Sequence, residues 1–135
     1  MKDGVERHPR FRDGSDERFD AWQRAHKMVV LTYKATEAWP KKERFGLTIQ
    51  VRRAALSVPT NIAEGAAKRG YREFRRFLDI ALGSLSELTY LLRFSRDLGL
   101  LTTASWAELE AVRDEAGKLT WQLYRTLRRE TLSHP

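Results

Sequence analysis

Apolar residues recur at intervals of three and four along most of this chain, and that spacing constrains the fold more than any other feature. Side chains at such intervals share one face of an α-helix. The most regular run alternates steps of four and three through Phe74, Leu78, Ala81, Leu85, Leu88 and Leu92. The 135 residues contain only eight glycines and four prolines, which fall mainly between the periodic segments. The sequence therefore predicts an all-α chain.

Four helices are expected, at about residues 21–39, 45–68, 71–98 and 105–129. The links between them are short, so each helix must run antiparallel to the one before it. The predicted fold is a left-handed, antiparallel up-down-up-down four-helix bundle, within a length that suits one domain. We expect a flexible N-terminal extension, the bundle and a frayed C-terminus at residues 1–18, 19–130 and 131–135.

Local residue patterns predict where these helices begin and end. Asp20 with Gln23, and Ser105 with Glu108, have the spacing of a capping box. In that motif two side chains bond to the free amides at the start of a helix. Gly99 follows the third predicted helix, where a residue in the left-handed conformation commonly ends the helix.

The composition excludes several classes of function. The chain has no cysteine, which removes disulfides, thiolate metal sites and cysteine nucleophiles. No apolar run is long enough to cross a membrane, and residues 1–18 lack the apolar centre of a secretory signal. We therefore expect a cytoplasmic protein that makes no membrane contact.

No arrangement of residues predicts catalysis or metal binding. Di-metal sites in helix bundles use a glutamate three residues before a histidine, and none of the three histidines has one. Gly65 and Gly70 share the glycine spacing of a phosphate-binding loop, but Tyr71 and Arg72 replace the lysine and hydroxyl residue that follow it. The sequence thus predicts a protein that is not an enzyme, with no catalytic residues, no metal and no cofactor.

Basic residues outnumber acidic ones by 25 to 18, which gives a net charge of +7 and favours anionic partners. In an up-down-up-down bundle, the starts of the first and third helices share one pole with the ends of the second and fourth. That pole would bring Arg24 near two clusters of cations, with Tyr71 and Tyr124 available for base stacking. The candidate nucleic-acid contacts are Lys68, Arg69, Arg72, Arg75, Arg76, Arg125, Arg128 and Arg129. A solvated helix surface is the alternative interpretation.

A second group of polar residues follows one side of the helix predicted at 45–68 and continues on the next helix. We call it the polar row, and it consists of Gln50, Arg53, Ser57, Asn61 and Glu64, with Ser84 and Glu87 as counterparts. Pro59 and Gly83 are unfavourable inside helices, which suggests a kink or a close approach nearby. The row is interpreted either as a solvated face or as a contact with another helix or subunit.

The segment 50–65, with its internal Ser-Val-Pro-Thr-Asn and terminal Glu-Gly, resembles the bacterial four-helix-bundle family of ribosomal-RNA intervening-sequence proteins. The resemblance extends over about residues 19–129 and continues at Phe74, Arg76, Phe77, Leu78, Ile80, Ala81, Gly83, Ser84 and Glu87. It implies an up-and-down bundle that assembles into a ring of five. A relative of similar fold, the accessory variability determinant of diversity-generating retroelements, binds nucleic acid and a reverse transcriptase.

Together, the residues and the resemblance predict a non-enzymatic homo-oligomer, a pentamer by the resemblance, that binds RNA or DNA through phosphate contacts. In the alternative hypothesis the chain is an adaptor that docks a protein partner, such as a reverse transcriptase, without binding nucleic acid directly. In that case the positive charge only steers the encounter. The polar row matches positions of the family's motif. It is either a structural contact or a surface that contacts a ligand.

Overall fold

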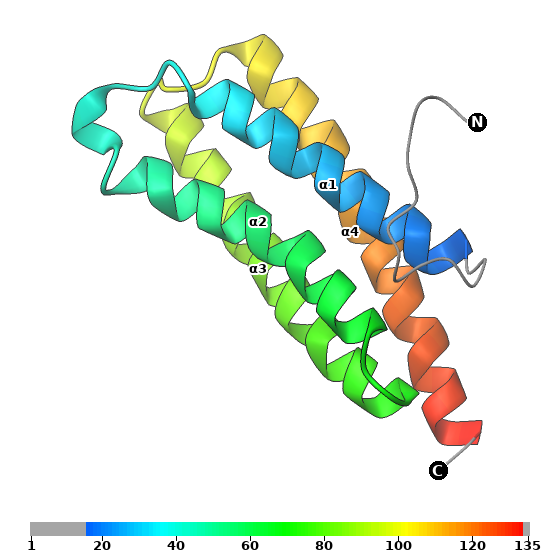
Figure 1. Ribbon diagram of the computed structural model, residues 1–135. Coiled ribbons are helices and arrows are strands. Elements are labelled where there is room, and N and C mark those ends of the chain that lie inside the picture. The colour runs from blue at the N-terminus through cyan, green and yellow to red at the C-terminus, as the bar shows by residue number, and fades with distance from the viewer. Residues whose placement is uncertain (1–15, 134–135) are drawn as a thin grey trace, which may run out of the picture.

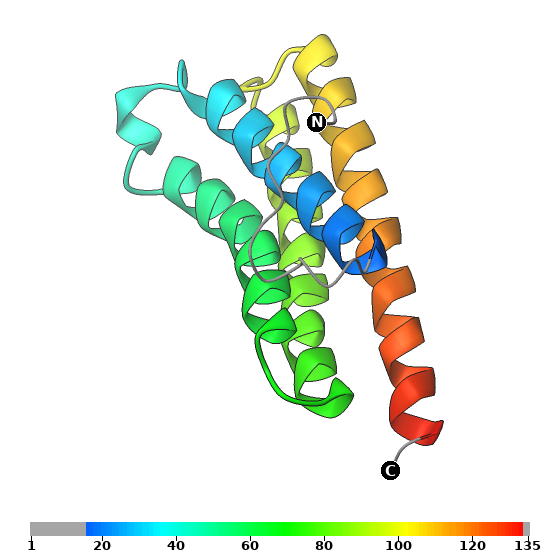
Figure 2. The same cartoon turned by 45° about the vertical axis from the view of Figure 1, so that its right-hand side comes forward.

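The computed structural model describes residues 16–133, and every long element in that range is a helix (Figure 1). The elements are α1 (Asp16–Thr36), the short 3-10 helix η2 (Lys41–Glu43), α2 (Leu47–Ala66), α3 (Tyr71–Asp97) and α4 (Thr103–Ser133). Consecutive long helices run in opposite directions (Figures 1 and 2). Helix α1 packs against α2 and α4, and α3 packs against the same two helices. The predicted all-α, up-down-up-down four-helix bundle is thereby confirmed.

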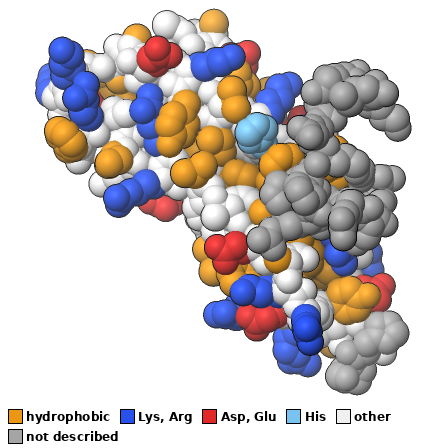
Figure 3. Space-filling model, viewed as in Figure 1, with side chains coloured by type: hydrophobic (Ala, Val, Ile, Leu, Met, Phe, Trp, Pro, Cys, Tyr) orange, Lys and Arg blue, Asp and Glu red, His pale blue; other side chains and the backbone are white. Residues whose placement is uncertain are grey.

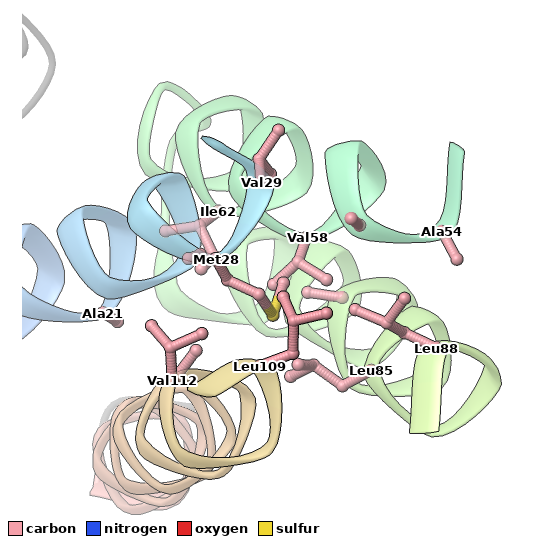
Figure 4. Packing of buried hydrophobic residues seen from close by; sticks show 14 of the residues in the cluster. Ala21, Met28, Val29, Ala54, Val58, Ile62, Leu85, Leu88, Leu109 and Val112 are labelled. Atoms are coloured by element: carbon pink, nitrogen blue, oxygen red, sulfur yellow. The ribbon is translucent and has the colours of Figure 1, made fainter. Parts of the chain in front are cut away.

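The core forms where the apolar stripes of the four helices meet. All six residues of the most regular run, from Phe74 to Leu92, are buried. Figure 4 shows Met28 of α1 pointing between α2, α3 and α4, toward the cluster that includes Val58 and Leu109. Each large side chain buried in this way stabilises the fold by roughly 1.5–3 kcal/mol. The spacing of apolar residues therefore predicted the buried faces correctly.

Helix α1 begins at Asp16, so the prediction of a start after Asp20 is wrong. Asp20 lies inside the helix and is exposed, so it does not cap the N-terminus. The earlier turn is held by tertiary packing, because the Arg18 guanidinium lies 5.3 Å from the centre of the Phe74 ring on α3. Residues 16–18 therefore belong to the bundle, and the rest of the predicted extension lies outside the described residues.

Helix α4 is longer than predicted at both ends. Thr102, not Ser105, caps it, because the Thr102 Oγ1 accepts a hydrogen bond of 3.0 Å from the Ser105 amide. The predicted fraying from residue 131 is wrong for 131–133, which are helical. Thr131 is buried and its hydroxyl donates to the Leu127 carbonyl at 2.8 Å. Residues 134–135 lie outside the described range.

The third helix ends as the sequence predicted. Gly99 has φ of 79° and its amide donates to the Arg96 carbonyl at 2.9 Å. The Leu100 amide donates to the Ser95 carbonyl at 3.0 Å, which completes a Schellman motif. Helix α1, in contrast, ends at Thr36, three residues earlier than predicted, and Trp39 is buried in the turn that follows.

Helix α2 continues without interruption through Pro59, which is buried. It begins at Leu47, two residues later than predicted, because Phe45 is 86% exposed and has no core contact to hold it in a helix. It also ends at Ala66, two residues earlier than predicted. Among the helices within residues 16–133, none is both long enough and apolar enough to cross a lipid bilayer.

Candidate functional site

The α2–α3 link and the last turns of α4 lie at the same end of the bundle (Figures 1 and 2). This arrangement brings two clusters of cations to one pole, as the topology predicted. We call the pole the basic end, formed by Lys68, Arg69, Arg72, Arg75, Arg76, Arg125, Arg128 and Arg129. All are exposed except Arg75, which is half-buried.

Two exposed cations of the basic end, Arg76 and Lys68, contact other side chains of the same chain. The Arg76 guanidinium pairs with Glu73, whose Oε1 lies 3.2 Å from Nε and 3.1 Å from Nη2. Arg76 also lies 5.4 Å from the centre of the Phe77 ring, and Lys68 Nζ lies 5.2 Å from the same centre. The charge of Arg76 is therefore partly neutralised, which makes it a weaker phosphate contact than its neighbours.

Arg69, Arg72 and Arg75 form no ion pair with any residue in the range 16–133. They lie within the α2–α3 link and the first two turns of α3, and the acidic Glu73 between them is already paired with Arg76. Three guanidinium groups with their charge uncompensated create a local positive potential. They are the strongest candidates for bidentate phosphate contacts.

The cations of α4 add to this potential from the neighbouring helix. Arg125 and Arg128 are exposed and have no ion pair among the described residues. One Arg129 nitrogen donates to the Thr126 hydroxyl at 3.3 Å, which leaves its charge intact. Since α3 and α4 pack together and run antiparallel, the first turns of α3 lie at the level of the last turns of α4.

Arg24 does not contribute as the sequence suggested. Its Nε forms an ion pair of 2.8 Å with Glu115 on α4, and both side chains are partly exposed. The pair ties α1 to α4 above the basic end. Because its charge is matched, Arg24 adds little to the positive field.

The polar row divides into two groups. Ser57, Asn61 and Ser84 form a hydrogen-bonded bridge between α2 and α3, in which the Ser84 hydroxyl donates to Ser57 Oγ at 2.8 Å. Asn61 Nδ2 donates to the Ser57 carbonyl at 2.7 Å and to Ser57 Oγ at 3.0 Å. The spacing correctly predicted that these residues lie together, and the bridge is a structural contact between helices.

The other members of the polar row are exposed and do not join the bridge: Gln50, Arg53, Glu64 and Glu87. Gly83 also differs from expectation, because no heavy atom lies within 4 Å of the position that a Cβ would occupy. The close approach of α2 and α3 occurs at Gly65, where a Cβ would be 2.7 Å from Phe74 Cδ1. Within one chain, Gly83 is therefore not required by packing.

Sequence reasoning missed an exposed apolar face on α3. We call it the outer stripe: its exposed apolar side chains are Ile80, Tyr90 and Phe94, and between them lie Gly83 and the exposed Glu87 of the polar row. Tyr90 is 66% exposed and its ring stacks on Phe94 with centres 6.2 Å apart. The steps of three and four along this stripe were visible in the sequence, but the more regular buried run on the same helix concealed them.

A second apolar surface lies over α1 and α2, where Figure 3 shows hydrophobic side chains gathered around the histidine. His26 stacks on Trp22 with ring centres 5.3 Å apart. Beside them is an open groove of about 370 Å³, lined by Leu56, Pro59 and Ala63 among others. Within residues 16–133, no three His, Asp or Glu side chains are placed to hold a metal ion.

A family model described as 23S rRNA-intervening sequence protein matches residues 17–122. The chain belongs to this family. The match covers most of the segment over which the resemblance was recognised, and it excludes most of the cations of α4.

A crystal structure of a protein of unknown function from the S23 ribosomal protein family of Bacteroides thetaiotaomicron has the same fold. The TM-score is 0.73 at 18% sequence identity, and the alignment covers 81% of this chain and 98% of the other. This similarity supports the four-helix architecture. No curated protein matches the chain.

Proposed function

We propose that the chain is a non-enzymatic, homo-oligomeric protein that binds RNA or DNA through the basic end. The observation that carries this proposal is the set of arginines Arg69, Arg72 and Arg75, which have no acidic partner among residues 16–133. Arg125 and Arg128 extend the same charge from α4. The matched family's description refers to 23S rRNA, which agrees with a nucleic-acid partner.

The basic end suits phosphate contact better than base recognition. Its cations lie on the sides of α3 and α4 and on the short α2–α3 link, and none of these elements projects from the bundle as a separate reading head for a nucleic-acid groove. Contacts of that kind neutralise phosphates and release counterions, so affinity falls steeply as salt rises. Assembly of several copies, each with a formal charge of +7, would multiply the attraction.

The outer stripe of α3 supports self-association. Ile80, Tyr90 and Phe94 are 46%, 66% and 41% exposed, so one chain leaves three large apolar side chains of this stripe in water, with Gly83 and Glu87 between them. Gly83 lies in the middle of this stripe with open space around it, which would let a second helix approach closely. We propose a second copy of this chain as the occupant, and a ring of five copies in accordance with the family resemblance.

Salt-dependent binding by matched variants tests the nucleic-acid proposal. Arg69, Arg72 and Arg75 are replaced together by glutamine, and affinity for a duplex RNA is measured from 50 to 300 mM salt. If all three contact phosphates, the slope of log affinity against log salt becomes shallower by about 2 to 3. The matched control replaces Lys41, Lys42 and Arg44, which carry the same charge at the opposite end of the bundle.

If both triple variants lose the same affinity for duplex RNA, the loss follows from net charge alone. That outcome would contradict a binding site at the basic end. Affinity independent of salt would contradict phosphate contact altogether.

The adaptor hypothesis is favoured by the same outer stripe, since exposed aromatic side chains are typical of protein-binding surfaces. In this function the stripe would dock an enzyme partner such as a reverse transcriptase, and the charge would steer the encounter. Replacement of Tyr90 and Phe94 by serine separates the two hypotheses. Loss of a stable oligomer supports self-association, whereas an unchanged oligomer that no longer co-purifies with a defined protein supports the adaptor.

A further inference from the structure

An aromatic pair on α4 presents Trp121 to solvent, while its partner Tyr124 is half-buried and packs against the core. Trp121 is 48% exposed, and its indole stacks on the Tyr124 ring with centres 5.4 Å apart and planes inclined by 12°. The neighbouring Leu119 and Leu123 face the bundle instead. A half-exposed tryptophan braced by a second ring is a flat apolar surface presented to solvent.

The pair continues the basic end along the outside of α4. Trp121, Arg125 and Arg128 are separated by four and three residues, so they follow one another on the same face of the helix. Lys118 lies one turn before Trp121, with its ammonium 3.1 Å from Asp114. Trp121 therefore lies between Lys118, whose charge is paired, and Arg125 and Arg128, which have no ion pair among the described residues. The positive potential increases from Lys118 toward these two arginines.

A flat ring followed by cations suits an unpaired nucleotide strand. Bases stack on aromatic side chains through their faces, irrespective of their identity, and the adjacent backbone is held by arginine. In a duplex the base faces are covered by neighbouring base pairs. Phosphate contacts alone would favour the duplex, because its charge density is higher than that of a single strand.

From this geometry we propose that the basic end takes single-stranded nucleic acid, with one base stacked on Trp121 and the following phosphates held by Arg125 and Arg128. The inference rests on the proposed function and narrows its substrate class. It predicts a contribution to affinity that depends on bases rather than on charge. This base-dependent part of the affinity can be measured separately from the part that depends on salt.

The experiment uses the full chain with three probes of equal length: a single-stranded oligouridine, the same strand without bases, and an RNA duplex. Replacement of Trp121 by alanine is expected to weaken binding of oligouridine roughly tenfold. Binding of the abasic strand and of the duplex should not change, and the salt slope should remain the same. Trp121→Phe keeps an aromatic face and should retain most of the affinity.

Phe45→Ala is the matched control, because Phe45 is 86% exposed at the opposite end of the bundle. Thermal unfolding and sedimentation of each variant verify that the fold and the association state are intact. An equal effect of Trp121→Ala on all three probes, or no effect on any, would overturn the stacking site. A changed association state would instead assign Trp121 to a contact between copies and would also overturn it.

The two proposals fail in different ways. If no probe binds in a salt-dependent manner, both the proposed function and the stacking site are wrong. If the probes bind and the triple arginine variant weakens all of them, while Trp121→Ala leaves oligouridine binding unchanged, only the stacking site is wrong.

Discussion

Ser84 on α3 donates a hydrogen bond of 2.8 Å to the hydroxyl of Ser57 on α2, and this polar contact joins the two helices beside their apolar core. Ser57 Oγ accepts a second bond from Asn61 Nδ2 at 3.0 Å. All three residues are half-buried, so water competes for these bonds only in part. The bridge therefore stabilises one orientation of α2 on α3.

Removal of Ser57 should cost more stability than removal of Ser84. Ser57→Ala removes the acceptor of the Ser84 hydroxyl and one of the two acceptors of Asn61 Nδ2, and we expect a loss of about 1–2 kcal/mol in the free energy of unfolding. Ser84→Ala removes one bond and should cost about 1 kcal/mol or less. Urea unfolding measures both, with the exposed Ser86→Ala as control. Strict additivity in the Ser57→Ala, Ser84→Ala double variant would show that the two hydroxyls are not coupled.

Two helix glycines should respond to alanine in opposite directions. At Gly65 a Cβ would lie 2.7 Å from Phe74 Cδ1 and 2.9 Å from Phe77 Cβ, so α3 must shift. We expect Gly65→Ala to destabilise the fold by about 1–3 kcal/mol. Gly83→Ala meets open space and should stabilise α3 by roughly 0.5–1 kcal/mol. Thermal unfolding of the two variants is the measurement, and a stabilised Gly65→Ala would contradict the close packing of α2 on α3.

A larger residue at Gly83 should interfere with assembly and leave the single chain intact. Gly83→Leu adds bulk in the middle of the outer stripe, where nothing within the chain lies within 4 Å. If a second copy packs there, sedimentation will detect smaller species at unchanged helix content. Ala107→Leu adds bulk at an exposed position of α4, away from the outer stripe, and is the control. An oligomer that survives Gly83→Leu would place the contact between copies elsewhere.

Paired and unpaired arginines should contribute differently to nucleic-acid binding. Arg24 is held 2.8 Å from Glu115, whereas Arg72 has no ion pair in the described chain. Arg72→Gln should therefore reduce the salt slope on duplex RNA by about 0.9, and Arg24→Gln should hardly change it. Arg24→Gln should also cost less than about 1 kcal/mol of stability, because both side chains of the pair are partly exposed to water. If Arg72→Gln and Arg24→Gln change the salt slope equally, an arginine without an ion pair binds nucleic acid no better than one with an ion pair, which would contradict this prediction.

The sequence by itself determined the helices and their buried faces, because both follow from local periodicity. A residue four positions after Leu88 must share its side of a helix, so Leu92 is buried with it. Gly99 likewise ended α3 as expected, since a left-handed turn after a helix depends on a single backbone position. The family resemblance rested on the same kind of information, the identity and spacing of residues along 50–65.

Only the tertiary structure decided which of several equivalent local patterns is used. Thr102 and Ser105 could both cap a helix, and Asp20 could as well, but the start of each helix follows from what the preceding turn packs against. Gly65 and Gly83 differ only in whether another helix lies opposite. The contact of Arg18 with Phe74 and the close approach at Gly65 are set by distances between separate helices, and no local spacing encodes such distances.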